Sequence, residues 1–273
     1  MAKIGVDGVT ILGVLGEANR LTDAERKAII QTATEAASGE IPVIVGASHS
    51  GTAATVQLSN MAADQGASGV MITPHREAIP NEQRIFTHFE TIASEISLPI
   101  ILQDHPISTQ VHMSLDLVLR MVNEIESIAC IKQEAVPSPA RVSALIAGMT
   151  TRRLPILTGL GALYGGFELQ QGADGFMTGF AFPEVLMAMV AASQASDMDR
   201  VFDIYQRFLP LMVFEGQPGV AVRKDIFRMR GLMRSSAVRA PASSITDSAR
   251  TQLEDVIRRV IGDTDLSLPL EIN

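Results

Sequence analysis

The residue of this chain best suited to covalent chemistry is a lysine at the end of an apolar run. Lys132 closes such a run within residues 127–134, which have the pattern of a short buried strand. The other lysines, Lys3, Lys27 and Lys224, lie among polar or charged neighbours. Burying an unpartnered ammonium group is very costly, and a desolvated lysine has a lowered pKa that leaves a nucleophilic amine. Lys132 is therefore a candidate for Schiff-base formation with a carbonyl substrate.

The sequence leaves alternative roles open for Lys132 and for Cys130. Lys132 could instead be solvated at the rim of a sheet and paired with Glu134 or another carboxylate. Cys130, the single cysteine, has the size of core filler, and a reactive thiol is the alternative. A single cysteine excludes an intramolecular disulfide and suits a reducing compartment.

Alternating strands and helices must position this lysine. Thr22 followed by Glu25 is a capping box, which predicts a helix from about residue 23. The predicted strands are 8–13, 42–46, 69–74, 99–103, 127–134, 154–158 and 175–179, and the predicted helices are 23–38, 51–65, 81–96, 114–123, 137–148, 162–171 and 183–195. This regular alternation predicts an α/β fold with a parallel sheet, and its even spacing favours a closed (β/α)8 TIM barrel. Residues 13–17 lack the GxGxxG spacing of a dinucleotide site.

The predicted pattern has seven strands, whereas a TIM barrel needs eight. Residues 1–195 would thus form a barrel whose first β/α unit is missing, unless another segment fills the gap. Residues 196–273 would form a C-terminal helical appendage, with helices over 197–214, 220–233 and 245–261. The tail, residues 266–272, alternates like a strand, but Pro269 would confine it to a sheet edge.

Composition narrows the possible partners. The chain is 47% hydrophobic and 19% charged, which is enough apolar material for a sizeable core. A net charge of −8 and the lack of a basic run argue against nucleic acid, although a local arginine cluster could bind a small anionic substrate. No apolar stretch has the length of a membrane span and no signal peptide is evident, so we expect a cytoplasmic protein.

Several segments match one known family in order and spacing. They are residues 5–8, 12–17, 21–26, 42–46 and 99–102, Pro106, and residues 131–132. On these residues, and over essentially the whole chain, the protein resembles the dihydrodipicolinate synthase / N-acetylneuraminate lyase family of Schiff-base (β/α)8 barrels. The resemblance implies that Lys132 condenses with pyruvate or a longer 2-oxo acid, and that the iminium acts as an electron sink. Members of the family usually begin with a further strand and helix, in agreement with the missing unit.

The resemblance also implies where the substrate is held. In the family a glycine-rich segment binds the substrate carboxylate; here residues 13–17 would do so through an anion-binding nest of the Val14 and Leu15 N–H groups. The hydroxyl groups usual in that segment are absent. Other substrate contacts are expected from the strand-end residues Thr158, Gly159, Gly179 and Phe180. Glycine permits close backbone approach, while Phe180 would be an apolar wall or simply core.

The chain departs from the family where a tyrosine normally transfers protons. Gln103 occupies that position, and an amide can hydrogen-bond but cannot exchange a proton near neutral pH. We hypothesise that His75 or His105 supplies the proton transfer, since histidine titrates near neutrality. The alternatives are that His105 caps a strand end and that His75 is a solvated loop residue. Arg76 would bind a distal carboxylate of the substrate or pair with Glu77.

The predicted function is therefore a class I lyase of a 2-oxo acid, of the aldolase or dehydratase type. The alternative within the family is 4-hydroxy-tetrahydrodipicolinate synthase, weakened by the missing tyrosine, threonines and arginine. An alternative of another class is a catalytically silent metabolite-binding barrel. A metal aldolase is disfavoured because Asp104 and His105, adjacent on a strand, point to opposite faces. We expect no metal or other cofactor, and a homodimer or homotetramer.

Overall fold

The computed structural model describes residues 1–76, 81–217 and 219–272. The chain divides into two compact units, each built from two segments. The first unit is Met1–Thr158 with Gln171–Met177, and the second is Gly159–Gln170 with Thr178–Asn273. The strands lie in the first unit, and the second is helical in its described residues.

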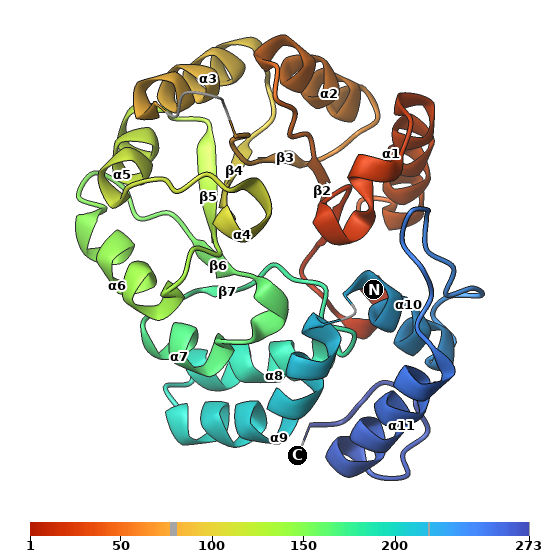
Figure 1. Ribbon diagram of the computed structural model, residues 1–273. Helices are drawn as coiled ribbons and strands as arrows, with labels where there is room; N and C mark the ends of the chain where they lie inside the picture. The colour runs from red at the N-terminus through yellow and green to blue at the C-terminus, as the bar shows by residue number, and fades with distance from the viewer. Residues whose placement is uncertain (77–80, 218, 273) are drawn as a thin grey trace. The chain divides into compact units, whose positions relative to one another are not determined.

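A parallel seven-stranded sheet forms the centre of the first unit in the described residues, with its strands in consecutive order (Figure 1). The strands are β1 (Val9–Ile11), β2 (Val43–Gly46), β3 (Gly69–Ile72), β4 (Ile100–Asp104), β5 (Ile128–Gln133), β6 (Ile156–Thr158) and β7 (Gly175–Phe176). Every neighbouring pair is parallel, as strands joined by crossover helices must be. The prediction of an α/β fold with a parallel sheet is confirmed.

The helices of the first unit follow the predicted segments closely. They are α1 (Asp23–Ala37), α2 (Thr52–Asp64), α3 (Glu82–Glu95), α4 (Pro106–Thr109), α5 (Leu115–Glu124) and α6 (Ser138–Gly148), with 3-10 turns η1 (Ala2–Ile4), η2 (Val14–Gly16) and η3 (Ala18–Arg20). Both hydrogen bonds of the Thr22–Glu25 capping box are present at the start of α1. Helices α1, α2, α3, α5 and α6 lie around the outside of the curled row of strands (Figure 1).

The two faces of the sheet carry different residues. Alternate strand residues pack with the helices in one apolar core: Val70, Ile72, Ile100, Leu102, Ile131 and Ile156, together with Phe86, Phe89, Met121 and Leu145. Complete burial of such side chains stabilises the fold by about 1.5–3 kcal/mol each. The residues between them, Met71, Ile101 and Cys130, are in register with one another and belong to the other face. That face also carries Lys132.

The second unit is an assembly of helices around α9. Its elements are η4 (Leu160–Ala162), α7 (Gly165–Gln170), α8 (Pro183–Gln194), α9 (Met198–Gly216), α10 (Val220–Met229) and α11 (Asp247–Ile261). Helix α9 contacts each of the others. A Cβ atom at Gly166 would lie 2.9 Å from the Tyr205 ring, so glycine allows α7 to approach α9. The predicted edge strand over residues 266–272 is wrong: this part of the chain forms a turn and irregular backbone.

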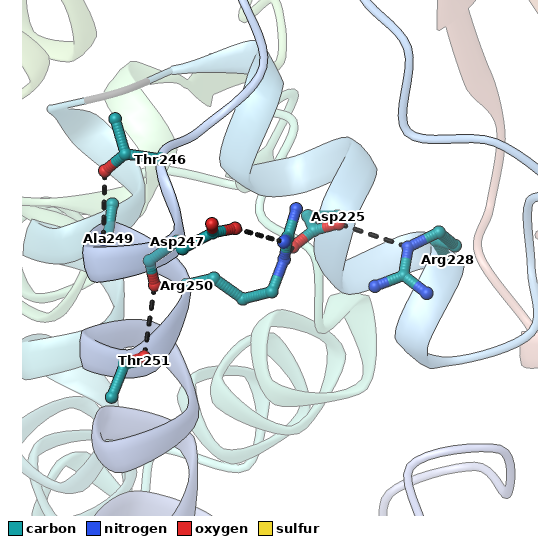
Figure 2. A network of polar contacts seen from close by, with 7 residues as sticks. All are labelled: Asp225, Arg228, Thr246, Asp247, Ala249, Arg250 and Thr251. Atoms are coloured by element: carbon teal, nitrogen blue, oxygen red, sulfur yellow. Dashed lines mark hydrogen bonds and ion pairs between the residues drawn. The ribbon is translucent and has the colours of Figure 1, made fainter.

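A network of charges joins α10 to α11 (Figure 2). Arg250 Nε lies 2.9 Å from Asp225 Oδ2, and Arg228 Nε lies 3.2 Å from Asp225 Oδ1. Burial alone would raise the pKa of Asp225, but the hydrogen bonds from Arg250 and Arg228 outweigh it and lower that pKa. The Thr246 hydroxyl caps α11 by accepting from the Ala249 N–H at 3.1 Å.

Among the helices that the structure describes, none is both long and apolar enough to cross a membrane.

Candidate active site

Lys132 lies near the carboxyl end of β5, in register with Gln103 of β4. Its exposed fraction is 9%, so the structure confirms a buried lysine. Because side chains alternate along a strand, Lys132 and Glu134 point to one face and Gln133 to the other. The backbone pairing continues past the strand, since the Glu134 N–H donates to the Asp104 carbonyl at 2.9 Å.

Lys132, Glu134 and Gln103 form the chemical centre of this strand end. Gln103 Nε2 donates to Glu134 Oε2 at 2.7 Å, and Lys132 Nζ lies 3.5 Å from the same oxygen. Gln103 and Glu134 are buried, with exposed fractions of 3% and 4%. The alternative expected a solvated Lys132 paired with a carboxylate. The pairing with Glu134 is present, but Lys132 is buried and not solvated. A buried amine next to a carboxylate has a proton acceptor at hand.

Asp104 serves a different purpose on the opposite face. Arg141 of α6 lies 2.9 Å from Asp104 Oδ2 and also donates to the Met113 carbonyl at 2.8 Å. Burial raises the pKa of Asp104, while the Arg141 guanidinium acts against that rise. Asp104 therefore ties β4 to α6, and this explains why it is absent from the group around Lys132.

His105 follows β4 and is half-buried at the start of α4. Its Nδ1 lies 2.5 Å from the Ser108 hydroxyl oxygen. Burial lowers the pKa of His105; the charge of Glu134 opposes this and the charge of Lys132 adds to it. The imidazole is thus neutral at pH 7 and within electrostatic reach of the lysine pair. Its catalytic role stays a prediction.

His75 and Arg76 follow β3 and are exposed. Arg76 Nη1 donates to Gln110 Oε1 at 2.6 Å, which joins Arg76 to the residue that follows α4. The alternative partner, Glu77, lies outside the described residues. The roles of His75 and Arg76 in proton transfer and substrate binding stay predictions.

The glycine-rich segment forms the 3-10 turn η2 next to β1 and β2. The hydrogen bonds that close the turn are donated by Gly16 and Glu17, so closing it does not occupy the N–H groups of Val14 and Leu15. A Cβ atom at Gly46 would lie 2.2 Å from the Leu12 carbonyl oxygen, so glycine at the end of β2 is required for this close approach. The turn is compatible with the expected anion nest.

The remaining predicted contacts fall in both units. Thr158 ends β6 in register with Gln133, so its side chain lies on the face opposite Lys132 and only its backbone could serve a molecule bound to the lysine. Gly159, Gly179 and Phe180 belong to the second unit. There Phe180 is buried with its ring 6.0 Å from that of Phe182, which agrees with the alternative of core packing.

Two buried contacts between a carboxyl group and an arginine hold the segment after β7 within the second unit. The Ala181 N–H donates to Glu215, whose Oε2 lies 3.1 Å from Arg223 Nε. Arg230 donates to the Ala181 carbonyl at 2.6 Å and pairs with Glu184. Burial raises the pKa of Glu215 to about 8, with Arg223 acting against the rise.

Cys130 has the properties expected of a packing residue and not of a reactive thiol. Burial raises the pKa of its thiol to about 11, which leaves the thiolate scarce at neutral pH. Cys130 lies two residues before Lys132 on β5, so its side chain points to the same face of the sheet. The reactive-thiol alternative is therefore disfavoured.

A parallel α/β sheet with a buried lysine beside a carboxylate at its strand ends has the features of a Schiff-base-forming enzyme. The chain belongs to the Dihydrodipicolinate synthetase family, whose model matches residues 2–260. The predicted family is confirmed, and with it the prediction of a Schiff-base-forming lyase.

Individual relatives carry different activities in their names. An L-2-keto-3-deoxyarabonate dehydratase from Azospirillum brasilense is 31% identical over 95% of this chain and 85% of its own length. A 4-hydroxy-tetrahydrodipicolinate synthase from Methanothrix thermoacetophila is 30% identical over 95% of this chain and 87% of its own. The crystal structure of dihydrodipicolinate synthase from Rhodopseudomonas palustris superimposes with a TM-score of 0.89, at 36% identity over 94% of this chain and 87% of that one.

From the sequence, Glu134 was expected only as a possible ion-pair partner of Lys132, and the structure adds its hydrogen bond with Gln103. Its signal was nevertheless in the sequence. A residue two positions beyond Lys132 on an extended segment points to the same face. The contact with Gln103 could not be read in this way, because it depends on the register between β4 and β5.

Proposed function

We propose that this protein is a class I lyase, of the dehydratase or aldolase type, acting on pyruvate or a longer 2-oxo acid through a Schiff base at Lys132. One observation carries the proposal: the Lys132 amine is buried at the end of β5, 3.5 Å from the Glu134 carboxylate. A strand end of a parallel sheet is where barrel enzymes place catalytic groups.

The first steps follow from the amine. Lys132 Nζ attacks the C2 carbonyl of the 2-oxo acid, and loss of water gives an iminium. The positive nitrogen withdraws electrons, so C3 can release to it the electron pair of either its C–H bond or its bond to C4. Loss of the C3 proton followed by breaking of the C4–O bond gives a dehydratase, and breaking of the C3–C4 bond with loss of the C4 hydroxyl proton gives an aldolase.

The second candidate is 4-hydroxy-tetrahydrodipicolinate synthase, which the names of several relatives favour. The dehydratase and synthase relatives are nearly equally identical to this chain, so the two activities must be distinguished by the residues of the site. At the position where the resemblance expects a tyrosine, this chain has Gln103, and Pro106 is followed by Ile107, Ser108 and Thr109 without an arginine. These departures favour a dehydratase or an aldolase over the synthase.

Borohydride trapping tests the proposal. The protein is incubated with pyruvate, reduced and digested, and the adduct is located by mass spectrometry. We expect the adduct on Lys132, its loss in Lys132→Ala, and its retention in Lys27→Ala, which removes an exposed lysine of α1. A protein that gives no adduct with pyruvate or any longer 2-oxo acid would be the silent metabolite-binding barrel.

The larger architecture belongs to the same proposal. Residues 1–195 would form a TIM-barrel body and residues 196–273 a helical region, in a cytoplasmic homodimer or homotetramer. The consecutive order of the parallel strands supports the barrel. Light scattering after size-exclusion chromatography measures the oligomer, and a monomer at working concentration would remove that part of the proposal.

A further inference from the structure

We propose that Glu134 is the group that takes and returns the substrate proton in this site, and that Gln103 is the positioning residue that holds it. This inference rests on the Schiff base at Lys132 proposed above and assigns the next step of the same reaction. It gives the site a carboxylate in place of the hydroxyl chemistry that the resemblance would imply.

The geometry brings the carboxylate to the reacting carbon. Glu134 Oε2 lies 3.5 Å from Lys132 Nζ, and the substrate C2 becomes bonded to that nitrogen in the Schiff base. The C3 carbon is then one further bond away, within the span that a side chain touching the nitrogen can cover. Proton transfer requires a heavy-atom distance near hydrogen-bond length, directly or through one water.

The chemistry of the neighbours points to the same residue. Gln103 can donate a hydrogen bond but cannot exchange a proton near neutral pH, whereas a carboxylate can. The 2.7 Å bond from Gln103 Nε2 to Glu134 Oε2 fixes the carboxylate on the face of Lys132. Asp104 lies on the opposite face, where Arg141 holds it. Among the described carboxylates, Glu134 is thus the one in contact with the lysine.

The step balances for a dehydratase. Glu134 removes a proton from C3 of the iminium, the C–H electron pair becomes the C2–C3 double bond, and the former C=N π pair moves to nitrogen as the enamine lone pair. That lone pair re-forms the iminium, the C2–C3 π pair becomes the C3–C4 double bond, and the C4–O bond breaks with its electron pair leaving on oxygen. The proton carried by Glu134 goes to the departing hydroxyl, which leaves as water, and the carboxylate is regenerated.

Proton exchange separates this step from Schiff-base formation. In D2O with pyruvate, the methyl protons exchange each time an enamine forms, and proton NMR measures the rate. For Glu134→Gln we expect the borohydride adduct at Lys132 to persist while exchange slows by about 100-fold or more. Glu126→Gln, which changes an exposed glutamate just before β5, is the matched control and should exchange at the wild-type rate.

The outcomes distinguish the two proposals. Absence of an adduct in the wild-type protein would overturn the Schiff-base function itself. A normal adduct with unchanged exchange in Glu134→Gln would overturn the role of Glu134 alone, and loss of both adduct and exchange in a folded variant would make Glu134 a structural residue. If Glu134→Gln melts below the assay temperature, Glu134→Asp is tested in its place. The shorter side chain moves the carboxylate away from the substrate, so exchange should slow by about tenfold or more while the adduct on Lys132 is kept.

Discussion

At the end of β5, a buried amine, a carboxylate and an amide contact one another on one face of the sheet. Taken singly, each is a costly group to bury. Together they satisfy one another: Gln103 donates to Glu134, and Glu134 lies against Lys132. A buried ion pair is weak evidence for stability, and such groups gather at functional sites, so the arrangement supports the proposed catalytic role.

The contribution of the amide can be measured at this scale. Gln103→Leu removes the donor to Glu134 while keeping a side chain of similar size. A hydrogen bond to a charged group is worth about 1.5–3 kcal/mol, which corresponds to roughly 10- to 100-fold in rate if the carboxylate loses its position. We expect pyruvate exchange to slow by that factor with the Lys132 adduct retained. Gln31→Leu, on the exposed side of α1, should leave exchange unchanged, and an unchanged rate in Gln103→Leu would contradict the positioning role.

At the scale of elements, the strand ends are held by contacts on the opposite face. Asp104 has an exposed fraction of 1%, and its ion pair with Arg141 joins β4 to α6. Arg141 also reaches the Met113 carbonyl before α5. The residue adjacent to Gln103 therefore anchors the strand from which Gln103 projects.

Removal of this anchor should cost stability. Asp104→Ala leaves Arg141 without its buried partner, and breaking a buried pair costs about 3–5 kcal/mol, so about 2–3 kcal/mol is expected for this partly exposed arginine. Urea unfolding measures it. Asp64→Ala, at an exposed position near the end of α2, should change the free energy of unfolding by less than about 0.5 kcal/mol. Equal effects of the two variants would show that the Asp104–Arg141 pair contributes nothing.

The elements themselves were largely predictable, because local signals determine them. The capping box of Thr22 and Glu25 placed the start of α1, and the apolar runs placed the strands. Helix α4, begun by Pro106, was missed because its four residues are too few for a periodic pattern. The tail was misread as a strand because alternation alone does not supply a partner strand, and Asp265 instead accepts hydrogen bonds from Ser267 in a turn.

The site was predictable in its nucleophile and not in its neighbours. Lys132 stood out because a cation ending an apolar strand is unusual. The contact between Gln103 and Glu134 depends on the register of β4 with β5, which a single sequence does not determine. The same holds for Thr158, whose face follows from its register with Gln133.

For the molecule as a whole, buried charges make stability depend on pH. An ordinary glutamate titrates near 4.5, whereas burial raises the pKa of Glu215 to about 8 in the folded chain. Between these values the folded state binds more protons than the unfolded state, so the free energy of unfolding falls as pH rises. Glu215 lies in the second unit, where its partner Arg223 is also buried.

This pH dependence has a direct test. Glu215→Gln cannot titrate, so we expect the wild-type free energy of unfolding to fall, relative to that of the variant, between pH 5 and about pH 8. Chemical denaturation across this range measures both. Glu254→Gln, exposed on α11, should follow the wild-type slope. Parallel curves for the wild type and Glu215→Gln would show that Glu215 is ionised throughout the range.

The central claim is that a buried amine on β5 captures a 2-oxo acid, and reduction with borohydride tests it most directly. After incubation with pyruvate, intact mass should increase by one reduced pyruvate, and peptide mapping should place the addition on Lys132. The addition should disappear in Lys132→Ala and persist in Glu134→Gln. An addition on any other lysine, or a protein that stays unmodified with every 2-oxo acid tried, would contradict the account.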